Sequence, residues 1–161
     1  MKSRLRLRPA SEKDARFYWH LRNEPSVREA SFQTKPIPWS EHKRWFSARM
    51  ANGKTRFFVA ESAAKRVGQI RVEPSRNKSA EISLAVAARE RGKGYGLAGL
   101  LEGCRYAFGR LHLKSLRAYV KPDNTISLAL FHCAGFRRQG VCRRHGTRAV
   151  RLVKSANPKG S

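Results

Sequence analysis

The clearest pattern in the chain is a change of hydrophobic period close to residue 87. Residues 80–86 alternate, with one side carrying Ile82, Leu84 and Val86 and the other carrying Glu81, Ser83 and Ala85. This is the period of a β-strand. After a basic, glycine-rich stretch over residues 89–96, apolar side chains recur at helical spacing at Leu97, Leu100, Leu101, Cys104, Ala107 and Phe108. The pattern predicts a strand, a glycine loop and a long helix in direct succession.

Weaker patterns of the same kind fill the rest of the chain. Strands are predicted over 4–8, 55–61, 67–72, 116–120, 136–142 and 147–153. Helices are predicted from Ser11 to about Arg22, from Ser40 to Asn52, and from Asn124 to just before Gly135. This order predicts an α/β (α+β) fold, in which a mixed central sheet of about seven strands carries helices on both faces. We expect residues 1–154 to form this single domain and residues 155–161 to be a disordered basic tail.

The charge of the chain is unusual for a domain of this size. Its 161 residues include 35 Lys and Arg against 11 Asp and Glu, a net charge of +24, and no acidic residue follows Asp123. Such a field attracts polyanions and raises their rate of encounter. Nucleic acid, the ribosome, an anionic membrane and a phosphorylated substrate are the candidate partners. A solvated basic surface without a partner is the alternative.

Other compositional signals narrow the class of protein. No apolar run approaches the length of about 18 residues that a membrane span needs, and the first residues lack the apolar core of a secretory signal. We therefore expect a cytoplasmic protein. Cys104, Cys133 and Cys142 are odd in number and lack CxxC spacing, and the histidines are scattered. Reduced thiols and no metal site are the expectation.

The glycine loop has the chemistry of an anion site. Gly92, Gly94 and Gly96 lack a Cβ, so the backbone can turn sharply and approach a ligand closely. The first amides of the following helix have no partner within the helix, and the helix dipole favours negative charge at that end. Positive charge comes from Arg89, Arg91 and Lys93. A pyrophosphate group suits this loop.

Two common phosphate loops fit less well. A P-loop requires Ser or Thr after its lysine, whereas Lys93 is followed by Gly94. Gly94-x-Gly96-x-x-Gly99 matches the dinucleotide-binding pattern, but this unit should open a domain, and the next strand ends at Lys121 where a ribose-binding acid is expected. The alternative that this stretch is a glycine-rich turn that binds no ligand also remains.

Arg91-x-x-Gly94-x-Gly96 after a strand resembles the acetyl-CoA loop of the GNAT family of N-acetyltransferases. Asn124-x-x-Ser127 followed by Gly135-Phe136 resembles the second landmark of that family. The order of elements also matches, so the resemblance covers nearly the whole chain.

The resemblance implies acetyl-CoA as donor and direct attack of a primary amine on the thioester. The pantetheine arm would lie along Leu84, Ala85 and Val86 like an added strand, beside a splay that exposes an amide to the thioester carbonyl. The pyrophosphate would bind the loop residues Arg91, Gly92, Lys93, Gly94, Tyr95 and Gly96. Asn124 and Ser127 would flank the arm.

For the chemistry itself, Glu81 on the central strand is the candidate base, directly or through water. A strand glutamate paired with solvent or arginine is the alternative. Many family members carry a tyrosine seven residues after the helix asparagine, where this chain has Phe131. The proton donor stays open among water, Tyr95, Tyr119 and His132, with departure of CoA as thiolate or a binding-only descendant as further alternatives.

The segment from Trp19 to Phe46 resembles the acetyltransferases of the pseudaminic acid pathway, which acetylate an amino sugar attached to UDP. The match is imperfect, since Leu21 stands where that subgroup often has a second tryptophan. The resemblance implies that the acceptor meets Arg22, Asn23, Arg28, Trp39 and His42. Acetylation of a ribosomal or N-terminal protein amine is an alternative. A basic nucleic-acid-binding protein without catalysis is another, although no helix-turn-helix, zinc-finger or RNP signature is evident.

Overall fold

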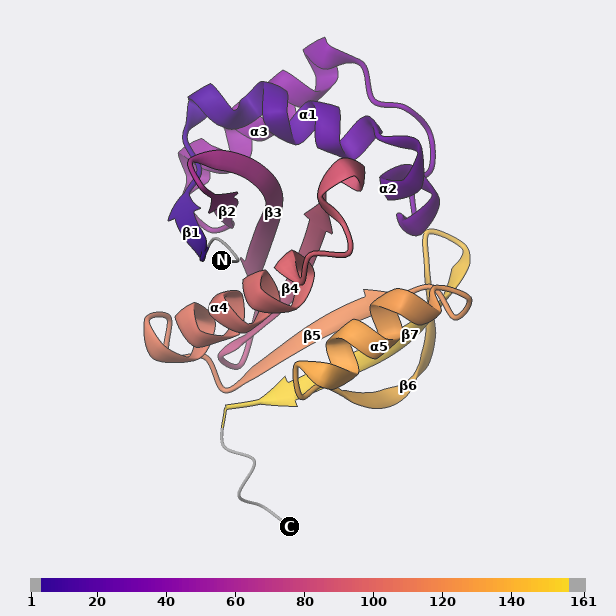
Figure 1. The fold of residues 1–161 in the computed structure, drawn as a ribbon. Helices are drawn as coiled ribbons and strands as arrows, with labels where there is room; N and C mark the ends of the chain where they lie inside the picture. Colours follow the sequence, from indigo (N-terminus) through magenta and orange to yellow (C-terminus); the bar gives the residue numbers. More distant parts are fainter. Residues whose placement is uncertain (1–3, 157–161) are drawn as a thin grey trace.

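The computed structural model describes residues 4–156 and contains a seven-stranded sheet with the order β1-β2-β3-β4-β5-β7-β6 (Figure 1). The strands are β1 (Leu5–Pro9), β2 (Arg56–Ser62), β3 (Lys65–Pro74), β4 (Ser79–Val86), β5 (Ser115–Val120), β6 (Arg137–Arg144) and β7 (Thr147–Ser155). The helices are α1 (Ala15–Asn23), α2 (Pro25–Ala30), α3 (Trp39–Asn52), α4 (Tyr95–Gly109) and α5 (Thr125–Cys133), with short 3-10 turns η1 (Glu12–Asp14) and η2 (Ala88–Glu90). Of the described strand pairs, β4 with β5 is parallel and the others are antiparallel.

Strand β2 is buried on both faces and shows how the layers are built. Phe58 points to one face and its ring lies 4.7 Å from that of Tyr106 on α4. Phe57 points to the other face, where its ring lies 5.6 Å from that of Tyr18 on α1 and 5.1 Å from that of Phe46 on α3. Figure 1 shows α1 and α3 on one side of the sheet and α4 on the other. The predicted mixed sheet with helices on both faces is confirmed.

Helix α4 lies unusually close to the sheet because of two buried glycines. A Cβ on Gly99 would lie 3.0 Å from the Cδ1 atom of Ile70, and one on Gly103 would lie 3.1 Å from side-chain atoms of both Ile70 and Ile82. Both isoleucines are almost fully buried. The close approach fixes α4 against β3 and β4, and so fixes where its N-terminus points.

The structure differs from the sequence predictions by one additional helix and at several element boundaries. Residues 25–30, predicted as loop, form α2, because Pro25 occupies the first helical turn, where its missing N–H is harmless. Helix α3 begins at Trp39 rather than after Ser40. Ser155, expected in the tail, is part of β7 and pairs with Ser115; residues 157–161 lie outside the described part of the chain.

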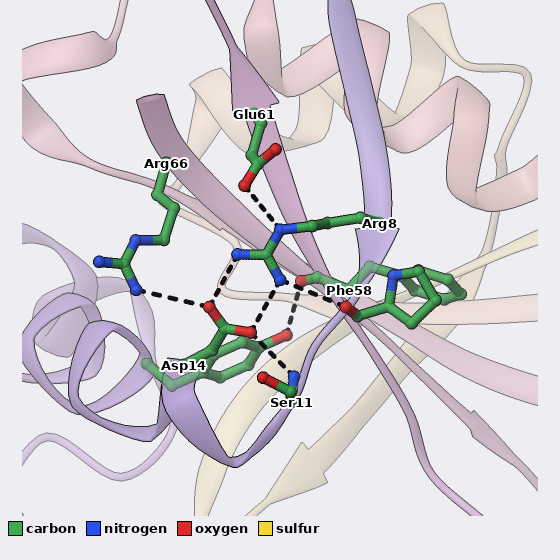
Figure 2. A network of polar contacts seen from close by, with 8 residues as sticks. Arg8, Ser11, Asp14, Phe58, Glu61 and Arg66 are labelled. Carbon is green, nitrogen blue, oxygen red and sulfur yellow. Dashed lines mark hydrogen bonds and ion pairs between the residues drawn. The ribbon is translucent and has the colours of Figure 1, made fainter. Parts of the chain in front are cut away.

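A buried carboxylate ties the first strand to the second and third. Asp14 is 2% exposed and accepts two hydrogen bonds of 2.8 Å from Arg8, one of 2.8 Å from the backbone N–H of Ser11 and one of 3.4 Å from Arg66. Arg8 also donates to Glu61 at 2.6 Å. Figure 2 shows Asp14 between the two guanidinium groups, with Glu61 beyond Arg8. The hydrogen bonds from Arg8 hold the pKa of Asp14 below its usual value.

Asp14→Asn should lower the free energy of unfolding by about 3 kcal/mol, because it removes one partner of a largely buried ion pair. Urea unfolding at neutral pH measures this loss. A folded-state pKa below the unfolded value means that the carboxylate stabilises the fold above pH of about 4 and loses this effect as the pH falls further. The difference between wild type and variant should therefore shrink in acid. Glu102→Gln, which breaks an exposed ion pair with Arg105, should change stability by about 0.5 kcal/mol or less. An Asp14→Asn loss no larger than that, or one independent of pH, would contradict this account.

Candidate active site

The central strand has an edge that no described strand covers. Strand β4 pairs with β5 only over Ser79–Glu81, opposite Ser115–Arg117, whereas it stays paired with β3 as far as Val86. The two strands then diverge (Figure 1). Apart from the carbonyl of Val86, which accepts from Arg91, the backbone groups of residues 82–86 on that side are not paired by a described strand, and an extended ligand can pair with them as an added strand does. This is the splay that the sequence resemblance implies, and it contains the predicted segment Leu84, Ala85 and Val86.

The glycine loop leaves a run of backbone amides free. Gly92 and Gly94 have φ of 78° and 82°, a left-handed conformation that glycine adopts without strain. At this end of α4 the first amide that donates a backbone hydrogen bond is that of Ala98, to the carbonyl of Gly94 at 3.1 Å. Within the described chain, the amides of residues 92–97 donate none. Together with the dipole of the long helix, these groups form an anion-binding end.

Gly96 places this end beside the open edge of β4. A Cβ at Gly96 would lie 3.4 Å from Leu130 of α5 and 3.8 Å from Val86. The start of α4 therefore fits between the end of β4 and α5. Asn124 caps α5, since its side-chain oxygen accepts from the amide of Ser127 at 3.1 Å. The two residues predicted to flank the arm are thus neighbours at the start of α5. The side chain of Asn124 is used to cap the helix, at the backbone N–H of Ser127.

A buried acid that the sequence analysis did not identify, Glu90, forms ion pairs with the glycine loop and with β3. Glu90 is 3% exposed and lies 2.6 Å from the ammonium group of Lys65 and 2.9 Å from that of Lys93. The hydrogen bonds from these lysines lower the pKa of Glu90 to about 2. Lys93, predicted to bind pyrophosphate, is thus engaged with Glu90, while the Nε of Arg91 donates to the carbonyl of Val86 at 3.2 Å. Glu90 is the single acid among the basic residues of 89–96, and this position could have marked it in the sequence as a residue that pairs with the loop.

Glu81 lies at the last rung shared by β4 and β5, where the splay begins. Its two carboxylate oxygens accept hydrogen bonds of 2.9 and 3.2 Å from Arg144 of β6. The Arg144 guanidinium carbon lies 4.1 Å from the ring centroid of Tyr119 on β5. Sequence reasoning missed Arg144, because it stands 63 residues from Glu81 and nothing local marks the contact.

Glu81 also lines a shallow pocket of about 280 Å³. The other lining residues come from the end of α3, the turn between β3 and β4, and β5: Arg49, Asn52, Lys54, Thr55, Glu73, Pro74, Ser75 and Arg117. Glu73 stands directly opposite Glu81 in the register of β3 and β4. The candidate base therefore faces a pocket in which both acids have basic neighbours.

The candidates for the proton donor lie in different places. Phe131 is 5% exposed and packs edge-on against Phe136 at 5.0 Å, so it belongs to the core. Tyr95 begins α4 and His132 is exposed on α5. Tyr119 shares Arg144 with Glu81, which puts its ring on the same side of the sheet as the candidate base.

Three of the predicted acceptor residues instead hold the loop before α3. Arg22 donates to the side chain of Ser31 at 2.7 Å and to the carbonyl of Gln33 at 3.1 Å. Asn23 accepts from and donates to the backbone of Ile37, at 2.8 and 3.1 Å. Arg28 donates to the carbonyls of Asn23 and Thr34 at 3.2 and 3.4 Å. These groups are committed to loop structure, and burial lowers the pKa of Arg22.

The remaining two predicted acceptor residues belong to an aromatic cluster. His42 is 3% exposed, and its ring stacks on Phe46 at 5.9 Å and Trp39 at 6.2 Å. Burial lowers the pKa of His42. The ring of Trp39 also lies 5.4 Å from that of Trp19. His42 is interior, because the apolar side of α3 turns it toward α1, and its predicted contact with the acceptor stays a prediction.

Across residues 4–156 no cluster of His, Cys, Asp and Glu is arranged to hold a metal ion. No helix in that range is long and apolar enough to cross a membrane. Cys104, Cys133 and Cys142 are free thiols, and burial raises the pKa of Cys104 to about 11.

Comparison with known proteins gives a consistent family. The family profile described as "Acetyltransferase (GNAT) domain" matches residues 4–137. The chain is 25% identical to a spermidine N(1)-acetyltransferase from Vibrio cholerae, over 87% of this chain and 83% of that one. It is 30% identical to the acetyltransferase PseH of Campylobacter jejuni, over 71% and 70%, and 32% identical to a phosphinothricin acetyltransferase homologue of Bacillus subtilis described as putative, over 71% and 72%.

Solved structures share the whole fold. A spermidine N-acetyltransferase from Vibrio cholerae, determined with CoA and spermine, matches with a TM-score of 0.85 at 22% identity, covering 94% of this chain and 95% of that one. An aminoglycoside acetyltransferase determined with coenzyme A matches with a TM-score of 0.83 at 17% identity, covering 94% and 95%. The chain belongs to the GNAT acetyltransferase family and is an N-acetyltransferase that uses acetyl-CoA as its acetyl donor.

Proposed function

We propose that the acceptor is a primary amine that also carries negative charge, and that a nucleotide-linked amino sugar is its chemical class. The observation that carries this proposal is the charge around Glu81. The pocket contains Arg49, Lys54 and Arg117 against Glu73 and Glu81. Arg144 adds a further cation at Glu81 itself.

The excess of basic over acidic groups around Glu81 should affect cationic and anionic acceptors differently. A polycation such as spermidine would enter a region where basic groups outnumber acidic ones, and repulsion would weaken its binding. An amine with a phosphate or diphosphate would be attracted by the same groups, since guanidinium groups pair well with phosphate oxygens. The surplus of cations therefore supports an anionic acceptor. The residues that would hold it are those of the pocket.

The reaction can be assigned to residues of this chain. Acetyl-CoA supplies a thioester whose acetyl group passes to nitrogen. The open edge of β4 holds the arm and offers a backbone N–H to the carbonyl oxygen as negative charge develops there. Glu81 accepts a proton from the acceptor ammonium, so the free amine forms the new C–N bond as the C–S bond breaks. The departing thiolate is protonated by water or by Tyr119.

A coupled assay of CoA release with several acceptors tests the proposal. The panel contains a UDP-linked amino sugar, the same free amino sugar, spermidine and a lysine peptide. We expect the highest kcat/KM with the UDP-linked sugar, because only it combines an amine with a diphosphate. A preference for spermidine or for the peptide would overturn the proposed acceptor class.

Glu81→Gln should lower kcat by about 10²–10⁴-fold if Glu81 is the base, since general base catalysis contributes about that factor. Affinity for acetyl-CoA, measured by calorimetry, should be unchanged. Glu73→Gln is the matched control, because it removes the cross-strand acid without removing the base. Equal kcat losses in the two variants would assign Glu81 a purely electrostatic role.

Gly94→Ala should weaken acetyl-CoA binding by about tenfold or more, equivalent to about 1.4 kcal/mol. An alanine at φ of 82° strains the backbone, and relief of that strain would turn the loop amides away from the ligand. Gly53→Ala is the control, because Gly53 has a similar φ of 66° but lies at the end of α3. Both variants should lose roughly 1–2 kcal/mol of stability, whereas only Gly94→Ala should lose affinity. Unchanged affinity in Gly94→Ala would argue against this loop as the pyrophosphate site.

A further inference from the structure

We propose that the β6–β7 hairpin binds the phosphate backbone of nucleic acid without reading its sequence. The hairpin spans residues 137–155 and forms one edge of the sheet (Figure 1). We call this surface the basic hairpin. The glycine loop, the open strand edge and Glu81 belong to β4, α4 and the segment between them, and among the described contacts of the hairpin's cations only that of Arg144 reaches Glu81.

The basic hairpin contains no acidic residue of its own. Its cations are Arg137, Arg138, Arg143, Arg144, Arg148, Arg151 and Lys154. Among the described contacts, Arg144 forms an ion pair with Glu81, and Lys154 and Arg143 donate to backbone carbonyls. No described ion pair or side-chain hydrogen bond involves Arg137, Arg138, Arg148 or Arg151. Several guanidinium groups are thus free to meet an external anion.

The register of the hairpin places like charges together. Arg143 lies directly opposite Arg148 next to the turn. Like charges in directly opposed positions of an antiparallel pair are destabilising. A phosphate group between or beside them would convert this repulsion into attraction. The arrangement is therefore more stable with a polyanion bound than without one.

Geometry also suits an extended anion. Strand β6 is an edge strand of the sheet, and its first five residues, 137–141, are exposed. The pairs 137–138 and 143–144 lie about 20 Å apart at the usual rise of an extended strand. The edge can therefore contact several successive phosphates.

The composition of the hairpin favours nucleic acid over an anionic membrane. Binding in the membrane interface needs apolar side chains that enter the headgroup region. Val141 is the single large apolar side chain of the described hairpin that is strongly exposed, at 46%. Arginine predominates, and its planar fork donates two hydrogen bonds to one phosphate.

Two charge-matched variants test the location. The hairpin variant carries Arg138→Gln, Arg143→Gln and Arg148→Gln. The control variant carries Arg44→Gln, Arg76→Gln and Arg110→Gln, which are exposed positions on α3, the turn before β4 and the end of α4. Each loses the same charge, so a uniform effect of net charge changes both equally. Circular dichroism melting establishes that both remain folded.

Binding of a labelled random-sequence DNA duplex is measured by fluorescence anisotropy over a range of KCl. Each lost phosphate contact lowers the slope of log K against log salt by about 0.9. We expect the hairpin variant to lose about 2–3 units of slope and the control about 1 or less. Acetyl transfer to the best acceptor of the panel should be unchanged in both variants, which keeps this result separate from the proposed acceptor class.

Three results would overturn the proposal. Equal slope losses in the two variants would mean that binding is diffuse rather than located on the basic hairpin. Absence of salt-dependent duplex binding by the wild type would mean that no such surface exists. Binding to vesicles containing phosphatidylserine at salt concentrations that abolish duplex binding would assign the surface to a membrane.

Discussion

Backbone hydrogen-bonding groups that the fold leaves unpaired determine what this enzyme can bind. A folded chain normally pairs nearly all such groups. Here the far edge of β4 is free after Glu81, and the amides of residues 92–97 donate to nothing within the described chain. These two sets are adjacent, because Gly96 lets the start of α4 fit against Val86 and Leu130. A ligand with an extended amide arm and a diphosphate can satisfy both sets at once.

The rest of the sheet keeps those groups in place. Strand β3 pairs with β4 from Ala80 to Val86, and close packing at Gly99 and Gly103 fixes α4 on the same two strands. Because the positions of the free groups come from packed elements, the site is formed before a ligand arrives. Such preorganisation reduces the ordering that binding requires. The opposite side of the sheet, where Glu81 meets Arg144 and lines the pocket, is where we propose that the acceptor binds.

Local patterns were sufficient for most of the fold and for the cofactor loop. Alternation, helical spacing and the cap at Asn124 depend on neighbours in sequence, and these three are confirmed. The α2 helix was missed because a proline was treated as an end rather than a beginning. The side-chain partners of the site were not predictable, because Arg144 with Glu81 and Lys65 with Glu90 are brought together only by sheet pairing. The surroundings of Arg22 and His42 were not predictable for a related reason: a polar residue on a helix has the same pattern whether it holds a loop, fills a core or faces a ligand.

The engagement of Glu90 has an effect on how the two anion-binding surfaces respond to ionic strength. Since Glu90 offsets one of the two positive charges of Lys65 and Lys93, the proposed binding of a diphosphate by the loop would rely in part on uncharged peptide dipoles. Such short-range contacts release few counterions, whereas the free arginines of the basic hairpin act through charges that mobile ions screen. On the two proposals made above, a rise in ionic strength would weaken binding of a polyanion to the basic hairpin more than binding of acetyl-CoA to the loop, so that surface attachment and catalysis could be set independently.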